Sequence, residues 1–240
     1  MIKRIDVRLA GRAAVGLCAA YLLLLTLAGC AGSGVRVETS LGTTAVPVDC
    51  SESVRGQQRA WDRQIATIAS EVLAREERLL VGCFVGRVTG VKWLPSFRGD
   101  ALPAMTGGAA GRRRAEVAWG LSLEPLFRRE LRVQGIPGTD WLSALHAASE
   151  ISKLTKVYLF SDLVQQAEGI ELANELSHQQ LAEIAQSWAP RLSGLRGKTV
   201  VEIGGGEKLV SSPSDDQGVA LLEELGRLVG FSVEPLSTLS

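Results

Sequence analysis

The chain has 240 residues, with 26 basic and 26 acidic side chains, two histidines and 46% hydrophobic residues. This composition predicts a globular protein with one domain of moderate size. A net charge of zero, without long runs of charge, argues against a nucleic-acid partner. Two histidines also leave little room for histidine-rich metal sites or histidine-based catalytic relays.

The first thirty residues are expected to form a targeting segment that is not part of the fold. Basic residues are frequent in the first twelve positions, and Ala13 to Ala28 is an apolar run. This run has the length of a signal-peptide core and is short for a membrane-spanning helix. It ends in Leu27-Ala28-Gly29-Cys30, which resembles the bacterial lipobox. Residues 1–29 are therefore predicted to be a signal peptide, and the alternative is a plain secretory signal with an incidental cysteine.

The lipobox resemblance implies that the thiol of Cys30 receives a diacylglyceryl group and that acyl chains such as palmitate anchor the protein. We expect a lipoprotein of the cell membrane or outer membrane that faces the periplasm or the exterior. Residues 30–43 are mostly small and polar, without apolar periodicity. They are predicted to form a flexible tether, followed by a folded domain over residues 44–240.

Strand-like and helix-like segments alternate after the tether. Thr44–Val48 is rich in β-formers, and Gln57–Arg78 has an apolar stripe with helical spacing. Leu79–Val88 is a continuous apolar run, which is typical of a buried strand. Val91–Leu94 is expected to add a short strand, and the Gly- and Pro-rich segment Pro95–Gly111 is expected to be a loop.

Two helices are expected in the middle of the chain. The first runs from Arg113 to about Val133, with a break or kink at Pro125. The second covers Trp141–Ser152, and the residue before it, Asp140, or else Thr139, would supply the N-cap.

The second half of the chain continues the alternation. Lys156–Phe160, Thr199–Ile203 and Phe231–Val233 are predicted strands, and Glu171–Trp188 and Val219–Val229 are predicted helices. The whole pattern predicts a three-layer, doubly wound (Rossmann-like) α/β domain with a mostly parallel central sheet flanked by helices. Ligands of such sheets bind at the carboxyl ends of the strands, where the strand order reverses.

Side chains with oxygen atoms gather in the loops at those strand ends. They are Asp49, Ser51 and Ser53 after the first strand, Thr139 before a helix, and Asp162 after the central strand. This arrangement resembles the metal-ion-dependent adhesion site of the von Willebrand factor type A (vWA) domain, whose pattern is D-x-S-x-S, then a Thr, then an Asp. The resemblance covers about Thr44 to Val233.

Hydroxyl and carboxylate oxygens are ligands that hard cations such as Mg²⁺ prefer. The resemblance implies that Ser51 and Ser53 bind Mg²⁺ (or Mn²⁺ or Ca²⁺) directly and that Thr139 binds it directly or through water. It implies that Asp49 and Asp162 act mainly through bound water and hydrogen bonds to the hydroxyl groups. The cation would then accept an acidic side chain of a protein partner at an open position.

Three features depart from the vWA pattern. Pro47 lies in the predicted first strand, where it removes a hydrogen-bond donor of the ladder. Leu163 occupies the position where the family usually has Gly, and Asp140 could substitute for Thr139 or compete with it. An alternative hypothesis is therefore a vWA-like fold with a vestigial metal site, in which the Ser and Thr side chains cap helices.

Cys50 and Cys83 lie on the first and second predicted strands, which are expected to be neighbours. In an oxidising envelope these residues would form a disulfide. Two buried thiols are the other interpretation, because Cys83 lies in an apolar segment typical of a core strand.

The sequence contains no G-x-S-x-G elbow, no paired-cysteine zinc pattern and no His-Glu-x-x-His motif. We therefore expect a protein that is not an enzyme: a membrane-anchored, extracytoplasmic binding protein that recognises a protein partner through a divalent cation. One alternative is a structural or scaffold component of a cell-envelope assembly that does not need the metal. A metal-assisted hydrolase is the other.

Overall fold

The computed structural model describes residues 42–86, 88–98, 111, 114, 117–118, 122–167, 169–172, 176–204 and 213–235. All of them belong to one unit, Ser40–Ser240. The predicted signal peptide, Cys30 and nearly all of the predicted tether lie outside the described residues. Within the described part, no helix is both long enough and apolar enough to cross a membrane.

A mostly parallel sheet forms the middle layer of this unit. Its main strands are β1 (Thr43–Asp49), β2 (Arg78–Val85), β3 (Val88–Trp93), β5 (Leu154–Phe160), β8 (Thr199–Ile203) and β9 (Ser232–Pro235), in the order β3-β2-β1-β5-β8-β9. Strands β2, β1, β5, β8 and β9 pair in parallel, whereas β3 and the short β4 (Phe97–Arg98) pair antiparallel with β2. The strand order reverses at β1, which has β2 on one side and β5 on the other.

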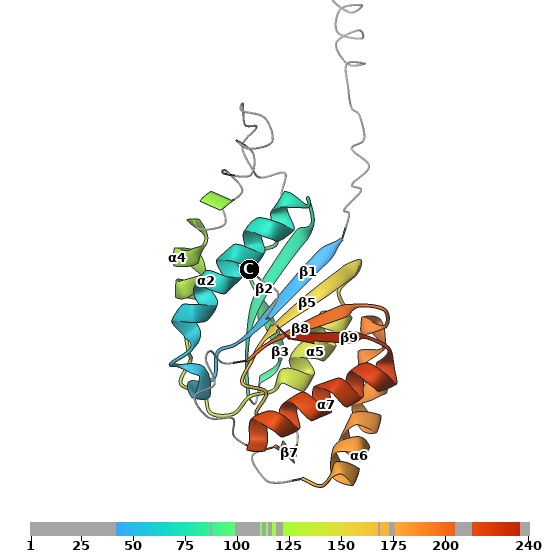
Figure 1. The fold of residues 1–240 in the computed structure, drawn as a ribbon. Coiled ribbons are helices and arrows are strands. Elements are labelled where there is room, and N and C mark those ends of the chain that lie inside the picture. The colour runs from blue at the N-terminus through green and yellow to red at the C-terminus, as the bar shows by residue number, and fades with distance from the viewer. Residues whose placement is uncertain are drawn as a thin grey trace, which may run out of the picture. The chain divides into compact units, whose positions relative to one another are not determined.

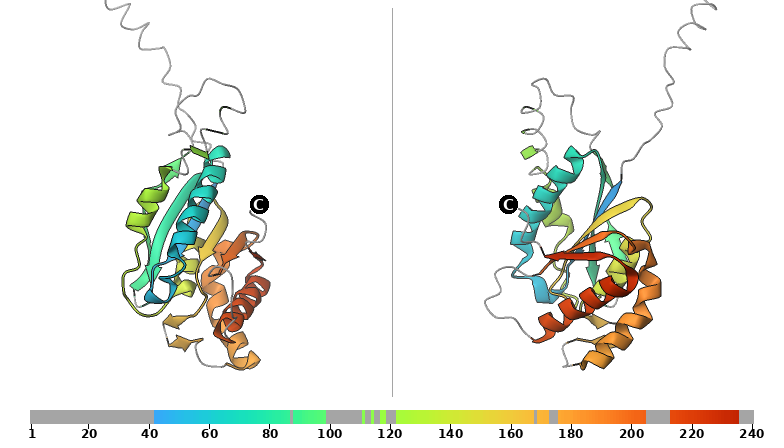
Figure 2. Two further views of the ribbon diagram at one scale, coloured as in Figure 1. Left: turned by 60° about the vertical axis from the view of Figure 1, so that its left-hand side comes forward. Right: turned by 45° about the vertical axis from the view of Figure 1, so that its right-hand side comes forward.

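Helices cover both faces of the sheet (Figure 1, Figure 2). One face packs against α2 (Gln58–Ala74) and α4 (Glu124–Glu130), and the other packs against α5 (Trp141–Ser149), α6 (His178–Trp188), the 3-10 helix η3 (Ala189–Leu195) and α7 (Pro213–Val229). Neighbouring residues of β1 point to opposite cores, so that Ala45 joins one hydrophobic cluster and Val46 the other. The predicted fold class, a three-layer doubly wound α/β domain, is confirmed by these layers and this strand order.

The predicted helix over residues 57–78 ends early. Helix α2 stops at Ala74, and Arg78 already belongs to β2. The chain reverses between them through Glu76, whose φ is 60°. The sequence does not indicate a residue other than glycine that adopts the left-handed backbone conformation. The helix predicted from the apolar periodicity alone was therefore too long.

The predicted strand Leu79–Val88 is two strands. β2 ends at Val85, and Val88 begins the antiparallel strand β3 after a turn at Gly86. In the predicted loop Pro95–Gly111, two residues form β4, and residues 99–110 lie outside the described part.

The helix predicted from Arg113 to about Val133, with a break or kink at Pro125, is interrupted beside that proline. Arg114, Val117, Ala118 and Ser122 are helical, Leu123 is a turn residue, and α4 starts at Glu124. Pro125 therefore lies in the first turn of α4, where a missing N–H removes no helical hydrogen bond.

The helix predicted from Glu171 begins later. Helix α6 starts at His178 because Ser177 and Gln180 form a capping box there. Glu171, the predicted start of α6, belongs instead to the hairpin of β6 (Gln166–Ala167) and β7 (Ile170–Glu171).

Pro47 lies inside the central strand β1 despite its missing N–H group. It pairs in register with Gly82 of β2 and is buried. Strand β2 pairs with β1 along the whole length of β1, and β5 pairs with β1 at Ala45 and at Val48, on either side of Pro47.

Candidate functional site

The predicted oxygen ligands lie at the carboxyl ends of the two central strands. Asp49 is the last residue of β1, and Ser51 and Ser53 follow in the loop that enters the 3-10 helix η1 (Glu52–Val54). Asp162 comes two residues after the end of β5, and β5 is the neighbour of β1. This is the point at which the strand order reverses, which is the usual ligand position of doubly wound sheets.

Asp49 is the centre of the hydrogen-bond network at this end of the sheet. Its Oδ1 accepts the backbone N–H of Ser51 at 2.8 Å. Its Oδ2 accepts the hydroxyl of Thr139 at 3.0 Å and the hydroxyl of Ser161 at 3.3 Å. The carboxylate is fully buried. It therefore joins three segments of the chain that are far apart in sequence.

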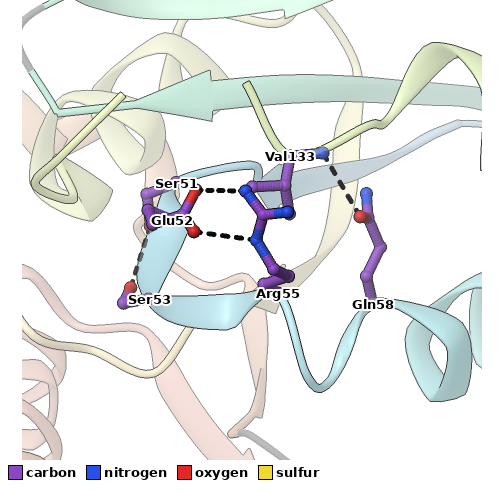
Figure 3. A network of polar contacts seen from close by, with 6 residues as sticks. All are labelled: Ser51, Glu52, Ser53, Arg55, Gln58 and Val133. Atoms are coloured by element: carbon purple, nitrogen blue, oxygen red, sulfur yellow. Dashed lines mark hydrogen bonds and ion pairs between the residues drawn. The ribbon is translucent and has the colours of Figure 1, made fainter. Parts of the chain in front are cut away.

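Three hydroxyl groups lie next to one another beside this carboxylate. The Ser51 hydroxyl is 2.9 Å from the Ser53 hydroxyl (Figure 3) and 3.1 Å from the Thr139 hydroxyl. Two neighbouring ligands of an octahedral Mg²⁺ ion, each about 2.1 Å from the metal, are themselves about 3 Å apart. The spacing of the hydroxyl oxygens therefore fits adjacent positions around a small cation. Ser51 and Thr139 are buried, whereas Ser53 is exposed at the solvent side.

The electrostatics of the site also fit a cation. Burial and the nearby negative charge of Asp162 raise the pKa of Asp49 to about 7, against the lowering effect of the hydrogen bonds from Ser51 and Thr139. Among the residues that the structure describes, no Lys or Arg forms an ion pair with Asp49. A divalent cation bound by the hydroxyl groups would supply the missing positive charge. The described residues contain no cluster of three or more His, Cys, Asp or Glu that could hold a metal.

The loop after β5 contributes a residue that the sequence analysis missed. Besides donating to Asp49, the Ser161 hydroxyl accepts the N–H of Leu163 at 3.0 Å, and Asp162 Oδ1 accepts the N–H of Val164 at 3.1 Å. Leu163 has a φ of 58°, a conformation that favours glycine. This explains physically why a glycine suits the position in the vWA pattern. The position of Ser161, directly before Asp162, was the available signal.

Thr139 and Asp140 have separate roles. Asp140 is the N-cap of α5, since its carboxylate accepts the N–H of Ser143 at 3.1 Å and the side-chain amide of Gln165 at 2.9 Å. Thr139 points instead toward Asp49 and Ser51. Ser51 precedes η1 but makes no side-chain capping bond. The hydroxyl groups of Ser51 and Thr139 therefore face one another and do not cap helices.

An ion pair lies on the solvent side of the same loop. Glu52, between the two serines, binds Arg55 through two hydrogen bonds of 2.8 and 2.6 Å (Figure 3). Both side chains are exposed, and the Arg55 guanidinium lowers the pKa of Glu52. The backbone N–H of Glu52 donates to the carbonyl of Ile136 at 3.3 Å, which connects the loop to the segment that leads to Thr139.

Cys50 and Cys83 form a disulfide that links the ends of β1 and β2. Of the two interpretations open from the sequence, the structure therefore has the cross-linked one. Cys50 lies between Asp49 and Ser51, so the cross-link is part of the loop that contains three of the predicted ligands.

Comparisons with known proteins give structural likeness without a family. No protein-family model and no curated protein matches the sequence. The chain is similar to the human COPII-coat protein Sec24c (14% identity, TM-score 0.47), over 83% of this chain and only 30% of that protein. It is also similar to the VWA domain of SpRpn10 (11% identity, 82% and 89% of the two chains, TM-score 0.38) and to manganese-loaded Plasmodium vivax TRAP protein (17% identity, 79% and 73%, TM-score 0.35). Because these TM-scores are below 0.5, the fold class rests on the strand order and layers described above.

The buried Asp49 predicts a pH dependence of stability in the presence of EDTA. Its pKa in the folded state, about 7, lies above its ordinary value of 3.8. The protonated carboxyl group therefore stabilises the folded state at low pH, and this stabilisation is lost as the pH rises through 7. We expect the free energy of unfolding, measured with urea, to fall between pH 5 and pH 8 by on the order of 2 kcal/mol more in the natural protein than in Asp49→Asn. Equal pH profiles of the two proteins would contradict this account of Asp49.

Proposed function

We propose that this chain is a vWA-like binding protein that holds a divalent cation, with Mg²⁺ as the first candidate, and uses it to recognise an acidic side chain of a protein partner. Ser51, Ser53 and Thr139 would hold the cation through their hydroxyl oxygens. Asp49 and Asp162 would balance its charge, and Asp49 would also orient the hydroxyl groups.

The convergence of the hydroxyl groups is the observation that supports this proposal most directly. Ser51, Ser53 and Thr139 come from two loops, yet the Ser51 hydroxyl lies within hydrogen-bond distance of both the Ser53 and the Thr139 hydroxyl groups. The competing interpretation of a vestigial site needs these residues as helix caps. Asp140 caps α5, and Ser51 makes no cap bond, so this explanation of the residue types has little support.

The donor set also suits recognition better than catalysis. When bound mainly by neutral hydroxyl groups, a divalent cation remains electrophilic and attracts a carboxylate from outside. Asp49 keeps the Thr139 hydroxyl in place by accepting its hydrogen bond, and burial protects this bond from water. Ser53 lies at the exposed side of the set, where a partner would approach. We therefore propose a role in binding, without catalytic turnover.

The location of the protein is part of the proposal. The lipobox resemblance at Cys30 supports a lipid anchor, and the small polar residues up to position 43 support a tether between the anchor and the domain. The disulfide fits an oxidising compartment outside the cytoplasm. The partner would then be a protein of the periplasm or the exterior.

The first prediction of this function concerns cation affinity. Calorimetric titration of the purified protein with Mg²⁺ and Mn²⁺ is expected to show one site. Thr139→Val, which replaces a hydroxyl with a methyl group, is expected to weaken Mg²⁺ binding by about tenfold or more, and Asp49→Asn by a similar factor.

Ser70→Ala is the matched control for the loss of a hydroxyl. Ser70 is buried on α2, and its hydroxyl donates only within the helix, to the carbonyl of Ala66 at 3.0 Å. The Mg²⁺ affinity of the Ser70→Ala variant is expected to stay within about twofold of the affinity of the natural protein. The absence of Mg²⁺ and Mn²⁺ binding by the natural protein would reject the cation site and leave a scaffold role.

The second prediction concerns the partner. Peptides selected from a random display library by the protein in Mg²⁺, and released by EDTA, are expected to be enriched in Asp or Glu. The reason is that the proposed open position of the cation accepts a carboxylate oxygen. Thr139→Val should recover no such enrichment. EDTA-sensitive binders without acidic residues would argue against recognition through a carboxylate.

A further inference from the structure

The disulfide between Cys50 and Cys83 lies within the proposed cation-binding loop. Cys50 occupies the position between Asp49 and Ser51, and its Cα atom is 5.8 Å from that of Cys83. Both cysteines are buried. We propose that this disulfide is the positioning element that sets the spacing of the hydroxyl ligands and hence the preference for Mg²⁺ over Ca²⁺. This inference rests on the proposed function and assigns a determinant of specificity to the same site.

The end of β2 holds both halves of the site. The loop that contains Ser51 is fixed to β2 by two bonds of Cys50. One is the disulfide, and the other is the hydrogen bond from Cys50 N–H to the carbonyl of Phe84 at 2.9 Å. In the other half of the site, Gly86 N–H donates to the carbonyl of Gly138 at 2.7 Å, directly before Thr139. The two loops that supply the hydroxyl groups are therefore both attached to the end of β2 and the turn residue Gly86 that follows it.

Gln134 connects the disulfide to the segment that leads to Thr139. Its backbone N–H donates to the carbonyl of Cys50 at 3.0 Å, and its side-chain amide donates to the sulfur of Cys83 at 3.4 Å. Loss of the covalent bond would thus loosen the loop of Ser51 and, through Gln134, the approach to Thr139. The distance of 3.1 Å between the Ser51 and Thr139 hydroxyl oxygens depends on the positions of both segments.

This spacing is what distinguishes the two cations. Mg²⁺ requires a near-ideal octahedron with short metal–oxygen distances, whereas Ca²⁺ accepts longer distances and variable geometry. A loop restrained by a cross-link keeps the oxygens close together and favours the smaller ion. A loop without the cross-link can open, which weakens Mg²⁺ binding more than Ca²⁺ binding.

Chemical reduction of the cross-link gives a direct comparison with the oxidised protein. A dithiol reductant would transfer two electrons and two protons to the protein, which breaks the bond between the two sulfur atoms and leaves two thiols. The reductant would itself become a disulfide. The reduced protein is expected to have the lower selectivity for Mg²⁺.

The test compares the oxidised protein, the dithiothreitol-reduced protein with its thiols counted, and the Cys50→Ser/Cys83→Ser double variant. Titrations with Mg²⁺ and with Ca²⁺ give two values of Kd for each form. Without the disulfide, the Kd for Mg²⁺ should rise by about tenfold and the Kd for Ca²⁺ by clearly less. Val72→Ala, a core substitution on α2, is the control for general destabilisation and should leave the ratio of the two values unchanged.

Amide hydrogen exchange in EDTA provides a second measurement that needs no cation. Exchange at Ser51 N–H, which donates to Asp49, should accelerate more than tenfold without the disulfide, while amides in β5 stay protected. Unchanged exchange at Ser51, or an unchanged ratio of the two Kd values in a protein that binds both cations, would overturn the inference. If the oxidised protein binds neither cation, the proposed function fails, and faster exchange at Ser51 would still assign the positioning role to the disulfide.

Discussion

The buried carboxylate of Asp49 is the constraint on which the rest of the site depends. A carboxylate without exposed surface is costly unless its oxygens are satisfied by hydrogen bonds or by a positive charge. Its partners Ser51, Thr139 and Ser161 lie 2, 90 and 112 residues away in the sequence. The three loops must therefore meet at the end of β1 for the carboxylate to be tolerated, and the hydroxyl groups that satisfy it are brought together as a consequence.

The topology of the sheet makes this meeting possible. Strands β1 and β5 are parallel neighbours, so their carboxyl ends, and the residues Asp49 and Asp162 that follow closely, lie at the same edge. Two carboxylates at one edge repel each other, which contributes to the raised pKa of Asp49. A cation at this edge would remove that repulsion. The fold thus brings Asp49 and Asp162 close together, and a cation bound by the neighbouring hydroxyl groups would offset their negative charges.

The fold class could be predicted from the sequence because buried strands and amphipathic helices have strong periodic signals. Thr199–Ile203 illustrates this, since its predicted ends and the ends of β8 agree. Helix ends were less predictable, because turns such as the one at Glu76 depend on a left-handed backbone without glycine. Local propensity does not indicate such a turn, and the apolar stripe continued past it.

The vWA pattern supplied the residue types of the candidate site, and the structure brings Asp49, Ser51, Ser53 and Thr139 together. The vWA pattern assigned the ligand position to Thr139, but residue type alone does not separate Thr139 from Asp140, since both suit a helix N-cap and both offer oxygen atoms. The contacts of Asp140 with Ser143 and Gln165 show that it caps α5, and the contact with Gln165 is tertiary information. Ser161 was missed for the same reason: its hydroxyl is useful only because β5 lies beside β1.

Diffraction from crystals soaked in Mn²⁺ would show whether a cation binds at the end of β1, because the anomalous signal of manganese locates the ion independently of the protein atoms. We expect one strong peak at the end of β1, within about 2.2 Å of the hydroxyl oxygens of Ser51 and Ser53 and close to Thr139. A peak bound to other residues, or an absence of any peak at this edge while Mn²⁺ is present at saturating concentration, would contradict the proposed cation site.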